Sequence, residues 1–228
     1  MGTKEITKKK IAVFDFCGTF VNFQTADAFI KWCLSKANLP TENKRKISAE
    51  RFFDKTYIST LFSIFDYSIR KRLIASQVKG LSEETISESA ISFIKEMVIP
   101  NIVDITRQLY FECKKKNYYL ILVSGAYNQY LCVFNSFFHF DKILSTELEI
   151  KRGVATGKIK NDCMGKKKAK KLKSFLNKQF GKNNYEICFS IGDSKSDLPV
   201  LKIAKRKVVV SNKDVDWAQN GYEVYHGY

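Results

Sequence analysis

Four short segments of this chain carry side chains that could transfer a phosphoryl group. They are Asp15-Phe16-Cys17-Gly18-Thr19, Val123-Ser124-Gly125, the run from Cys163 through Lys166-Lys167-Lys168, and the run from Ile191 through Pro199. A carboxylate such as Asp15 is a competent phosphoryl acceptor. A second carboxylate, Asp193, would let the pair hold one Mg²⁺ through oxygen ligands. The Ser124 hydroxyl and a lysine ammonium could then hold the phosphoryl oxygens, because phosphoryl transfer depends mostly on positioning and charge neutralisation.

Short apolar runs precede most of these segments and must position them. Such runs occupy residues 11–14, 118–123, 187–191 and 208–210. They lack polar alternation, which is typical of strands buried on both faces of a parallel sheet. Helical patterning precedes them, as at residues 102–115. The alternation predicts an α/β fold with a doubly wound, mostly parallel, Rossmann-like sheet, whose ligands bind beyond the carboxyl ends of the strands.

The stretch between the first and second predicted strands has a different pattern. From residue 22 to residue 100, aromatic and aliphatic side chains recur at helical spacing and strand-like runs are almost lacking. Ser82, followed by acidic residues, can cap one of these helices. We therefore expect an α/β core formed by residues 1–21 and 101–228, with an all-helical cap formed by residues 22–100. Residues 143–159 predict a short β-hairpin after the second core strand.

Composition and charge narrow the class of protein. The 228 residues suffice for one α/β domain with an insertion, and no apolar stretch is long enough for a signal peptide or a membrane span, so we expect a cytoplasmic protein. The six cysteines form no Cys-x-x-Cys pair and only two histidines are present, which argues against a zinc site. The net charge of +16 makes nucleic-acid binding a hypothesis to consider. However, the lysines are spread along the chain, and the dense run at 166–173 is typical of one solvated face of a helix, so nucleic-acid binding is not the expected function.

In this order, the four segments resemble the haloacid dehalogenase superfamily, specifically its phosphoserine-phosphatase-like branch with a helical cap after the first strand. The resemblance extends from about Lys9 to Asn212. Its most specific part is Gly-Asp-Ser-x-x-Asp-Leu-Pro-x-Leu, at residues 192–201. The run Cys-x-Gly-x-x-Lys identifies Lys168, rather than its neighbours, as the phosphate-binding lysine. The resemblance implies a phosphoric monoester hydrolase.

The resemblance also implies a magnesium site. Asp15 would be both the nucleophile and a Mg²⁺ ligand, and the backbone carbonyl of Cys17 would be a second ligand. Asp193 would bind Mg²⁺ directly or through water. Asp197 would orient Lys168 or a metal-bound water from behind these ligands.

A further set of residues would hold the substrate. The resemblance implies that Ser124, with Gly125 beside it, and Lys168 grip the phosphoryl group, and that Thr19 supports the nucleophile loop and the bound substrate. Gln24 follows this loop closely and could face the cleft between cap and core. The residues beside it, Thr25 and Asp27, are explained equally well by capping of the next helix.

Cys17 departs from the family pattern. That position usually holds an aspartate that protonates the leaving alcohol and then deprotonates the attacking water. A thiol with a pKa near ~8.5 is a poor replacement. Three outcomes stay open: a slow enzyme, replacement of the aspartate by another group such as Asp27, or a persistent phosphoenzyme that transfers phosphate to an acceptor other than water. A binding or regulatory protein without turnover is the alternative of another class.

The resemblance suggests a small substrate. Family members with such a cap act on phosphoserine or other phosphorylated amino alcohols and polyols. Chains with the Asp15–Thr19 segment are also similar to phosphatases of bacterial surface-polysaccharide assembly, so the alcohol could be attached to a sugar or nucleotide carrier. Arg51, Arg70 and Arg72 lie in the predicted cap and could grip a substrate carboxylate, but a surface role is the simpler expectation.

Overall fold

The computed structural model describes residues 7–37, 67–212, 215–218 and 221–226. Arg51 and the helical pattern expected at residues 52–65 lie outside the described residues. Among the described helices, none combines the length and the apolar character needed to cross a bilayer.

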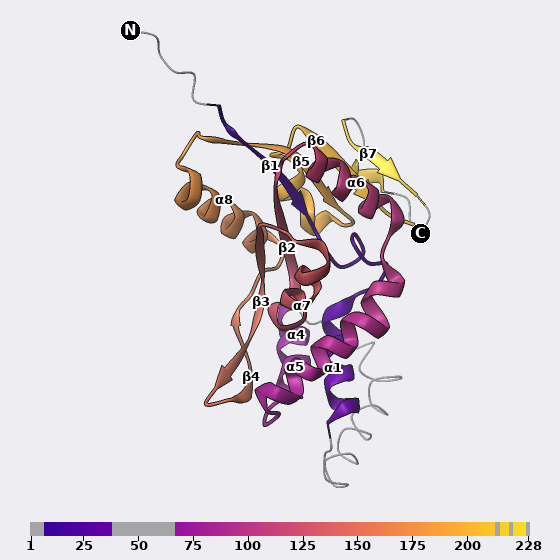
Figure 1. Ribbon diagram of the computed structural model, residues 1–228, viewed down its shortest axis with the longest axis vertical. Coiled ribbons are helices and arrows are strands. Elements are labelled where there is room, and N and C mark those ends of the chain that lie inside the picture. Colours follow the sequence, from indigo (N-terminus) through magenta and orange to yellow (C-terminus); the bar gives the residue numbers. More distant parts are fainter. Residues whose placement is uncertain (1–6, 38–66, 213–214, 219–220, 227–228) are drawn as a thin grey trace.

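Seven strands form one sheet in the order β4-β3-β2-β1-β5-β6-β7 (Figure 1). The strands are β1 (Lys9–Phe14), β2 (Tyr119–Tyr127), β3 (Lys142–Lys151), β4 (Val154–Asn161), β5 (Tyr185–Gly192), β6 (Arg206–Val210) and β7 (Glu223–Tyr225). Every neighbouring pair is parallel except β3 and β4. The predicted doubly wound, mostly parallel sheet is confirmed, and each of the four expected core strands is present.

Helices connect the strands and cover the sheet (Figure 1). They are α1 (Thr25–Lys36), α4 (Tyr67–Ser76), α5 (Glu83–Phe93), α6 (Asp104–Lys115), α7 (Asn128–Phe138), α8 (Lys166–Phe180) and α9 (Leu198–Leu201). Shorter helical turns span Ile94–Val98, Ile99–Asn101, Lys195–Asp197 and Asp216–Ala218. Ser82 is the N-cap of α5, as expected, because its side chain accepts a hydrogen bond from the Thr85 backbone N–H at 3.0 Å.

The central strand β1 shows why its sequence is uniformly apolar. Ala12 and Phe14 face the buried cluster that contains the apolar sides of α6 and α7. Ile11 and Val13 face the opposite cluster, which includes Leu172 of α8. Successive side chains of a strand point to opposite faces, so a strand covered by helices on both sides needs apolar residues at every position.

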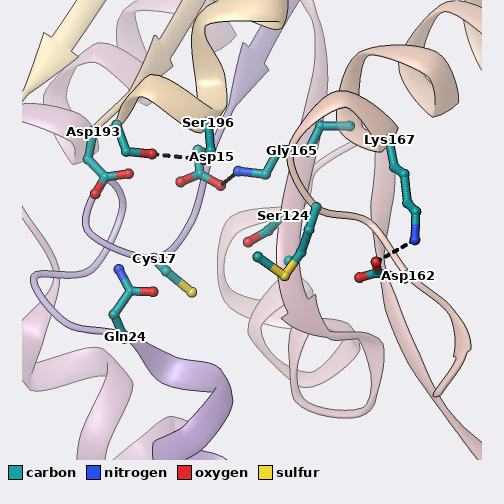
Figure 2. A pocket seen from close by; sticks show the side chains of 13 residues that line it. Asp15, Cys17, Gln24, Ser124, Asp162, Gly165, Lys167, Asp193 and Ser196 are labelled. Atoms are coloured by element: carbon teal, nitrogen blue, oxygen red, sulfur yellow. Dashed lines mark hydrogen bonds and ion pairs between the residues drawn. The ribbon is translucent and has the colours of Figure 1, made fainter. Parts of the chain in front are cut away.

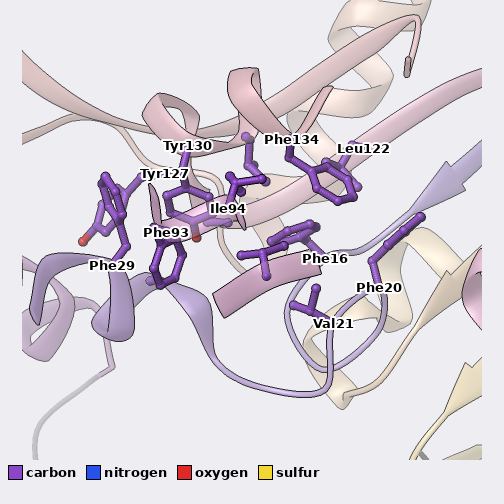
Figure 3. Packing of buried hydrophobic residues seen from close by; sticks show 14 of the residues in the cluster. Phe16, Phe20, Val21, Phe29, Phe93, Ile94, Leu122, Tyr127, Tyr130 and Phe134 are labelled. Carbon is purple, nitrogen blue, oxygen red and sulfur yellow. The ribbon is translucent and has the colours of Figure 1, made fainter. Parts of the chain in front are cut away.

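Aromatic side chains anchor the loop that follows β1. Phe16 packs edge-on against Phe134 with ring centroids 4.9 Å apart, and Phe20 packs against Phe138 at 4.8 Å (Figure 3). Both side chains of the loop are fully buried. Edge-to-face aromatic pairs add stabilisation beyond the burial of area. The buried aromatic side chains of this loop therefore anchor it, with the candidate nucleophile, to the hydrophobic core.

The helices before β2 share this core with the sheet. Phe29 of α1 and Phe93 of α5 lie with ring centroids 4.7 and 5.3 Å from that of Tyr130 of α7 (Figure 3). The described part of the predicted cap is helical throughout its regular elements. The Asn22 N–H donates to the Asn101 carbonyl at 3.1 Å, so the two connections of this insertion lie side by side. The domain limits at residues 22 and 100 stay a prediction.

The predicted hairpin of β3 and β4 is confirmed, and its first strand also belongs to the parallel sheet, which the sequence did not indicate. Residues 142–144 pair parallel with residues 121–123 of β2 before the same strand continues into the hairpin. The hairpin then contacts the inserted helices: Gly80 N–H donates to the Ala155 carbonyl at 2.9 Å, and Ala155 N–H donates to the Leu81 carbonyl at 2.8 Å. The insertion is thus joined to the sheet by backbone hydrogen bonds.

A buried lysine of α4 forms a second tie between the insertion and the core. Lys71 is 3% exposed, and its Nζ donates to the Gly125 carbonyl and to Thr146 Oγ1, each at 2.7 Å. The same ammonium lies 3.3 Å from Asp162 Oδ1. Burial lowers the pKa of Lys71, and Asp162 opposes that effect. Three segments of the core therefore satisfy one charge that comes from the insertion.

Replacing Lys71 tests this tie. Lys71→Met keeps the apolar stem but removes the ammonium donor of the buried Gly125 carbonyl and of Thr146 Oγ1, which keeps only the Cys163 N–H. We expect the free energy of unfolding to fall by about 1–3 kcal/mol, the cost of unsatisfied buried polar groups. Urea unfolding followed by circular dichroism measures it, with the exposed Lys31→Met of α1 as the matched control. Equal stability of the two variants would contradict the assigned role.

Candidate active site

The candidate site lies where the sheet reverses its winding order. The chain runs through β1, β2 and β3 toward one edge and through β5, β6 and β7 toward the other, so β1 and β5 flank the switch point. Asp15 follows β1, and its N–H donates to the Ile191 carbonyl of β5 at 3.0 Å. Asp193 follows β5 directly. Parallel strands end at one edge, so these carboxylates meet where open α/β sheets bind ligands.

Ser124 reaches the same edge within a strand. The sequence placed it after the end of β2, but β2 continues to Tyr127 and its register with β3 shifts between Val123 and Tyr127. Tyr127, and not Ser124, is the N-cap of α7. Ser124 therefore does not cap α7. Its Oγ accepts a hydrogen bond from the Ala126 N–H at 3.2 Å, which leaves the hydroxyl hydrogen available as a donor.

A cavity of about 630 Å³ opens at this edge (Figure 2). Its lining is formed by Asp15, Cys17, Gln24, Ser124, Gly125, Asp162, Met164, Gly165, Lys167, Lys168, Asp193, Ser194 and Ser196. Most of the residues expected at the site thus line this one cavity. Thr19 and Asp197 are the expected residues that do not line it; both are buried behind it.

Lys168 is the centre of a buried ionic network. Its Nζ donates to Asp15 Oδ1 at 2.7 Å and to Asp197 Oδ1 at 2.6 Å. Burial by itself would lower the pKa of Lys168, but the two carboxylates raise it above its usual value, so the ammonium stays charged. Its neighbours Lys166 and Lys167 are exposed, whereas Lys168 is 6% exposed. The resemblance of this run to the family motif thus indicated the buried lysine, although Lys167 also lines the cavity.

Asp197 is fixed through both oxygens. Besides its contact with Lys168, its Oδ2 accepts hydrogen bonds from the Ser194 N–H at 3.3 Å and from Ser194 Oγ at 3.0 Å. A Cβ at Gly192 would lie 2.7 Å from the Asp197 Cβ, so only glycine permits this approach. These contacts fix the Asp197 carboxylate beside Lys168, which fits the expectation that Asp197 orients this lysine.

Thr19 contacts Asp15, the candidate nucleophile, on the side away from the cavity. It is fully buried, and its Oγ1 donates to Asp15 Oδ2 at 3.3 Å. Thr106 Oγ1 in turn donates to the Thr19 carbonyl at 2.7 Å. The expected support of the nucleophile loop fits these contacts, whereas a direct contact of Thr19 with substrate does not, because its side chain does not reach the cavity.

Three carboxylates gather beside the nucleophile loop. Oxygens of Asp15, Asp193 and Asp197 all lie within 4.8 Å of one another. Burial, then the charges of Asp15 and Asp197, raises the pKa of Asp193 to about 8. Burial and the charge of Asp197, opposed by Lys168, raise the pKa of Asp15 to about 6. One lysine does not balance two buried acids and a half-buried third, so the site favours an added cation.

The donor atoms present fit Mg²⁺. A Cβ at Gly18 would overlap the Asp193 carboxylate, and Gly18 has a φ of 73°, so the peptide that joins Cys17 to Gly18 lies against Asp193. A backbone carbonyl and two carboxylates would supply oxygen ligands, which Mg²⁺ prefers, from one side of the cavity. Asp197 is less available because Lys168 and Ser194 already use its oxygens.

Cys17 points into the cavity with its thiol in a hydrogen-bonded chain. Its Sγ lies 3.0 Å from Thr25 Oγ1, which lies 2.5 Å from the Tyr130 hydroxyl. Burial, then the charge of Asp15, raises the pKa of Cys17, so the thiol stays protonated and cannot serve as a base. Asp27 does not replace it: its carboxylate pairs with Arg70 at 3.0 Å, and it does not line the cavity.

The structure also brings in residues that the sequence did not indicate. Asp162 and Lys167 lie 2.8 Å apart on the side of the cavity away from Asp193 (Figure 2). Burial alone would raise the pKa of Asp162, but Lys167 and Lys71 hold it below its usual value. Asp162 directly precedes the Cys163 motif, and this position was the only feature of the sequence that could have indicated a place in the site. Lys71 had none, because it stands between two arginines in a polar stretch.

Comparisons with known proteins agree with this geometry. The family model of the haloacid dehalogenase-like hydrolases matches residues 12–202. The phosphoserine phosphatase of Methanocaldococcus jannaschii is 26% identical over 215 residues, which cover 91% of this chain and 88% of that protein.

Two solved structures show the shared fold. A Bordetella pertussis Tohama I protein of unknown function superposes with a TM-score of 0.75 at 17% identity, over 96% of this chain and 98% of that chain. A phosphoserine phosphatase from T. onnurineus superposes with a TM-score of 0.57 at 17% identity, over 98% of this chain and 91% of that chain. The chain therefore belongs to the haloacid dehalogenase-like hydrolases, as a phosphoserine-phosphatase-like member of that superfamily.

Proposed function

We propose that this phosphoric monoester hydrolase is Mg²⁺-dependent and cleaves a small phosphate ester through an aspartyl phosphate on Asp15. The observation that carries the proposal is the placement of Asp15 at the switch point, bonded to the Lys168 ammonium and adjacent to Asp193. A carboxylate that lines the cavity and is held in one orientation by a charged donor is placed to attack phosphorus in line.

The reaction would proceed in two transfers. An Asp15 oxygen forms a bond to phosphorus while the bond from phosphorus to the alcohol oxygen breaks, and the alcohol oxygen takes up a proton from solvent as it leaves. Water then attacks the aspartyl phosphate, releases phosphate and restores the carboxylate. Lys168 and the Ser124 hydroxyl hold the phosphoryl oxygens through both steps. Their positions are set before substrate arrives, which is the main source of such catalysis.

Asp15, Asp193 and the carbonyl of Cys17 would hold the magnesium ion. When bound, the ion neutralises charge between the phosphate and the carboxylates. Asp193 needs this partner because Lys168 donates to the other two acids and not to it.

Asp15→Asn tests the nucleophile. The amide keeps the size of the side chain but removes the attacking carboxylate, so we expect phosphate release from a reactive aryl phosphate to fall by at least roughly 10³-fold. The exposed Asp104→Asn of α6 is the charge-matched control and should keep the parent rate. Unchanged release by Asp15→Asn would remove the basis of the proposal.

Asp193→Asn tests the metal ligand. We expect the Mg²⁺ concentration for half-maximal phosphate release to rise at least about tenfold, because losing a carboxylate ligand weakens a metal site at least as much as losing an outer partner. Titrating Mg²⁺ into protein stripped with a chelator measures this, beside the same Asp104→Asn control. Full activity of the stripped parent would show that no metal is required.

Cys17 makes proton transfer the slow part of the proposed cycle. A protonated thiol cannot take a proton from water, and a thiol with a raised pKa is a weak acid toward the leaving alcohol. The aspartyl phosphate should therefore persist, which also leaves room for transfer to an acceptor other than water. This feature favours phosphotransfer as the second candidate function.

Cys17→Asp should restore the missing proton transfer. We expect the turnover rate to rise by roughly 10²-fold, within the range that a positioned acid–base group contributes, and the phosphoenzyme in acid-quenched samples to decrease. Cys17→Ser is the control, since it has similar size but no acidic group. The same rate in both variants would mean that position 17 takes no part in proton transfer.

The substrate class belongs to the proposal as well. We place a phosphorylated amino alcohol, polyol or sugar-linked alcohol in the cavity, because the relative from Methanocaldococcus jannaschii is a phosphoserine phosphatase. A role in surface-polysaccharide biosynthesis rests only on the likeness of the Asp15–Thr19 segment. A cytoplasmic location agrees with six free cysteines, since reducing compartments keep thiols free.

A further inference from the structure

A second cavity, of about 520 Å³, adjoins the candidate active site between α4 and β4. Its charged lining residues are Lys71, Arg72, Lys158, Lys160, Lys167 and Asp162. We call this group the basic cavity. It comprises five cations and one carboxylate, whereas the active-site cavity is lined by three carboxylates and two lysines. The basic cavity therefore has much the larger excess of positive charge.

The charge of the basic cavity is only partly compensated within the described residues. Asp162 is shared between Lys71 and Lys167, and Lys160 lies 3.8 Å from Glu147. Arg72 and Lys158 have no carboxylate of the described chain within ion-pair distance. Several donors thus converge on one concave surface with charge to spare for an anionic ligand.

The fold brings these residues together from distant segments. Gly157 of β4 has a φ of 76°, and a Cβ there would lie 2.9 Å from the Lys79 Cβ and 3.0 Å from the Ser76 carbonyl oxygen. The strand can therefore approach the end of α4 only at a glycine. That approach places Lys158, the next residue, beside Arg72 of α4 in the lining.

The basic cavity is continuous with the active site. Asp162 and Lys167 line both cavities. In Figure 2 they lie on the side of the active-site cavity opposite Asp193, with Ser124 between. A ligand whose phosphate contacts Asp15 and Ser124 would extend past Lys167 into the basic cavity.

We propose that the basic cavity binds a second phosphate group, on the alcohol part of the substrate. The inference rests on the proposed function, because it takes the first phosphate to lie at Asp15. A phosphate dianion matches the surplus of positive charge better than a single carboxylate, and guanidinium and ammonium groups are its usual partners. A neutral alcohol would leave these charges to water and gain nothing from the cavity.

Direct binding tests the site without turnover. The probes are alkane bisphosphonates of increasing chain length, compared with alkyl monophosphonates of the same lengths, titrated calorimetrically in the presence of Mg²⁺. We expect at least one bisphosphonate to bind about 10- to 100-fold more tightly than its monophosphonate, as charged hydrogen bonds allow. The preference should weaken as salt is raised, because exposed charges are screened.

Lys158→Gln with Lys160→Gln should reduce that preference to a few-fold or less. The matched control is Lys170→Gln with Lys173→Gln, which removes the same charge from exposed positions of α8. Thermal unfolding of both variants checks that the fold is kept. No preference for bisphosphonates in the parent, or an equal loss in the control, would refute the second phosphate site and leave only a solvated basic surface.

Turnover separates this inference from the proposed function. Alkanediol bisphosphates and hydroxyalkyl monophosphates of matched length are compared by kcat/KM, and the ratio should fall in the Lys158/Lys160 variant but not in the control. Phosphate release without any preference for the bisphosphates would contradict the inference alone. Tight bisphosphonate binding with no release from either ester would contradict the proposed hydrolysis and leave the second phosphate site in place.

Discussion

The buried ammonium of Lys168 is the interaction on which the site depends. Removing a lysine and its partners from water is costly, and the cost is offset only when each charge is paired and hydrogen-bonded. Lys168 of α8 meets this condition through Asp15, which follows β1, and Asp197, which lies in the helical turn after β5. These contacts form only when α8 packs against the sheet in its native position, so the fold sets the orientation of the Asp15 carboxylate.

The surrounding charges divide the site into two parts. At one end, buried acids exceed the single lysine among them, which suits a divalent cation and a phosphoryl group. At the other end, Lys167 and the basic cavity carry surplus positive charge. A substrate with anionic groups at both ends would be oriented by this asymmetry before any bond changes, which is how positioning lowers the barrier of phosphoryl transfer.

The inserted helices take part in the site through a few specific ties. Lys71 bonds the Gly125 carbonyl next to Ser124, and Thr25 of α1 bonds the Cys17 thiol. Tyr130 packs against aromatic rings from α1 and α5. Because these contacts reach the loops that would hold the phosphoryl group, a movement of the insertion would shift the loops around Asp15. The protonated thiol of Cys17, in contrast, supplies no base to this site.

The sequence by itself determined the sheet and the main chemical groups. Uninterrupted apolar runs predicted the buried strands, because local pattern reflects burial on both faces. The carboxylates at the ends of predicted strands indicated Asp15 and Asp193, and the resemblance of a motif to a known family indicated Lys168. Only the tertiary structure decided that Lys71 is buried, that Thr19 lies behind the nucleophile, that residues 142–144 extend the parallel sheet, and that lysines of β4 meet α4. The reason is that the burial and pairing of a polar side chain depend on neighbours distant in sequence, which no local period encodes.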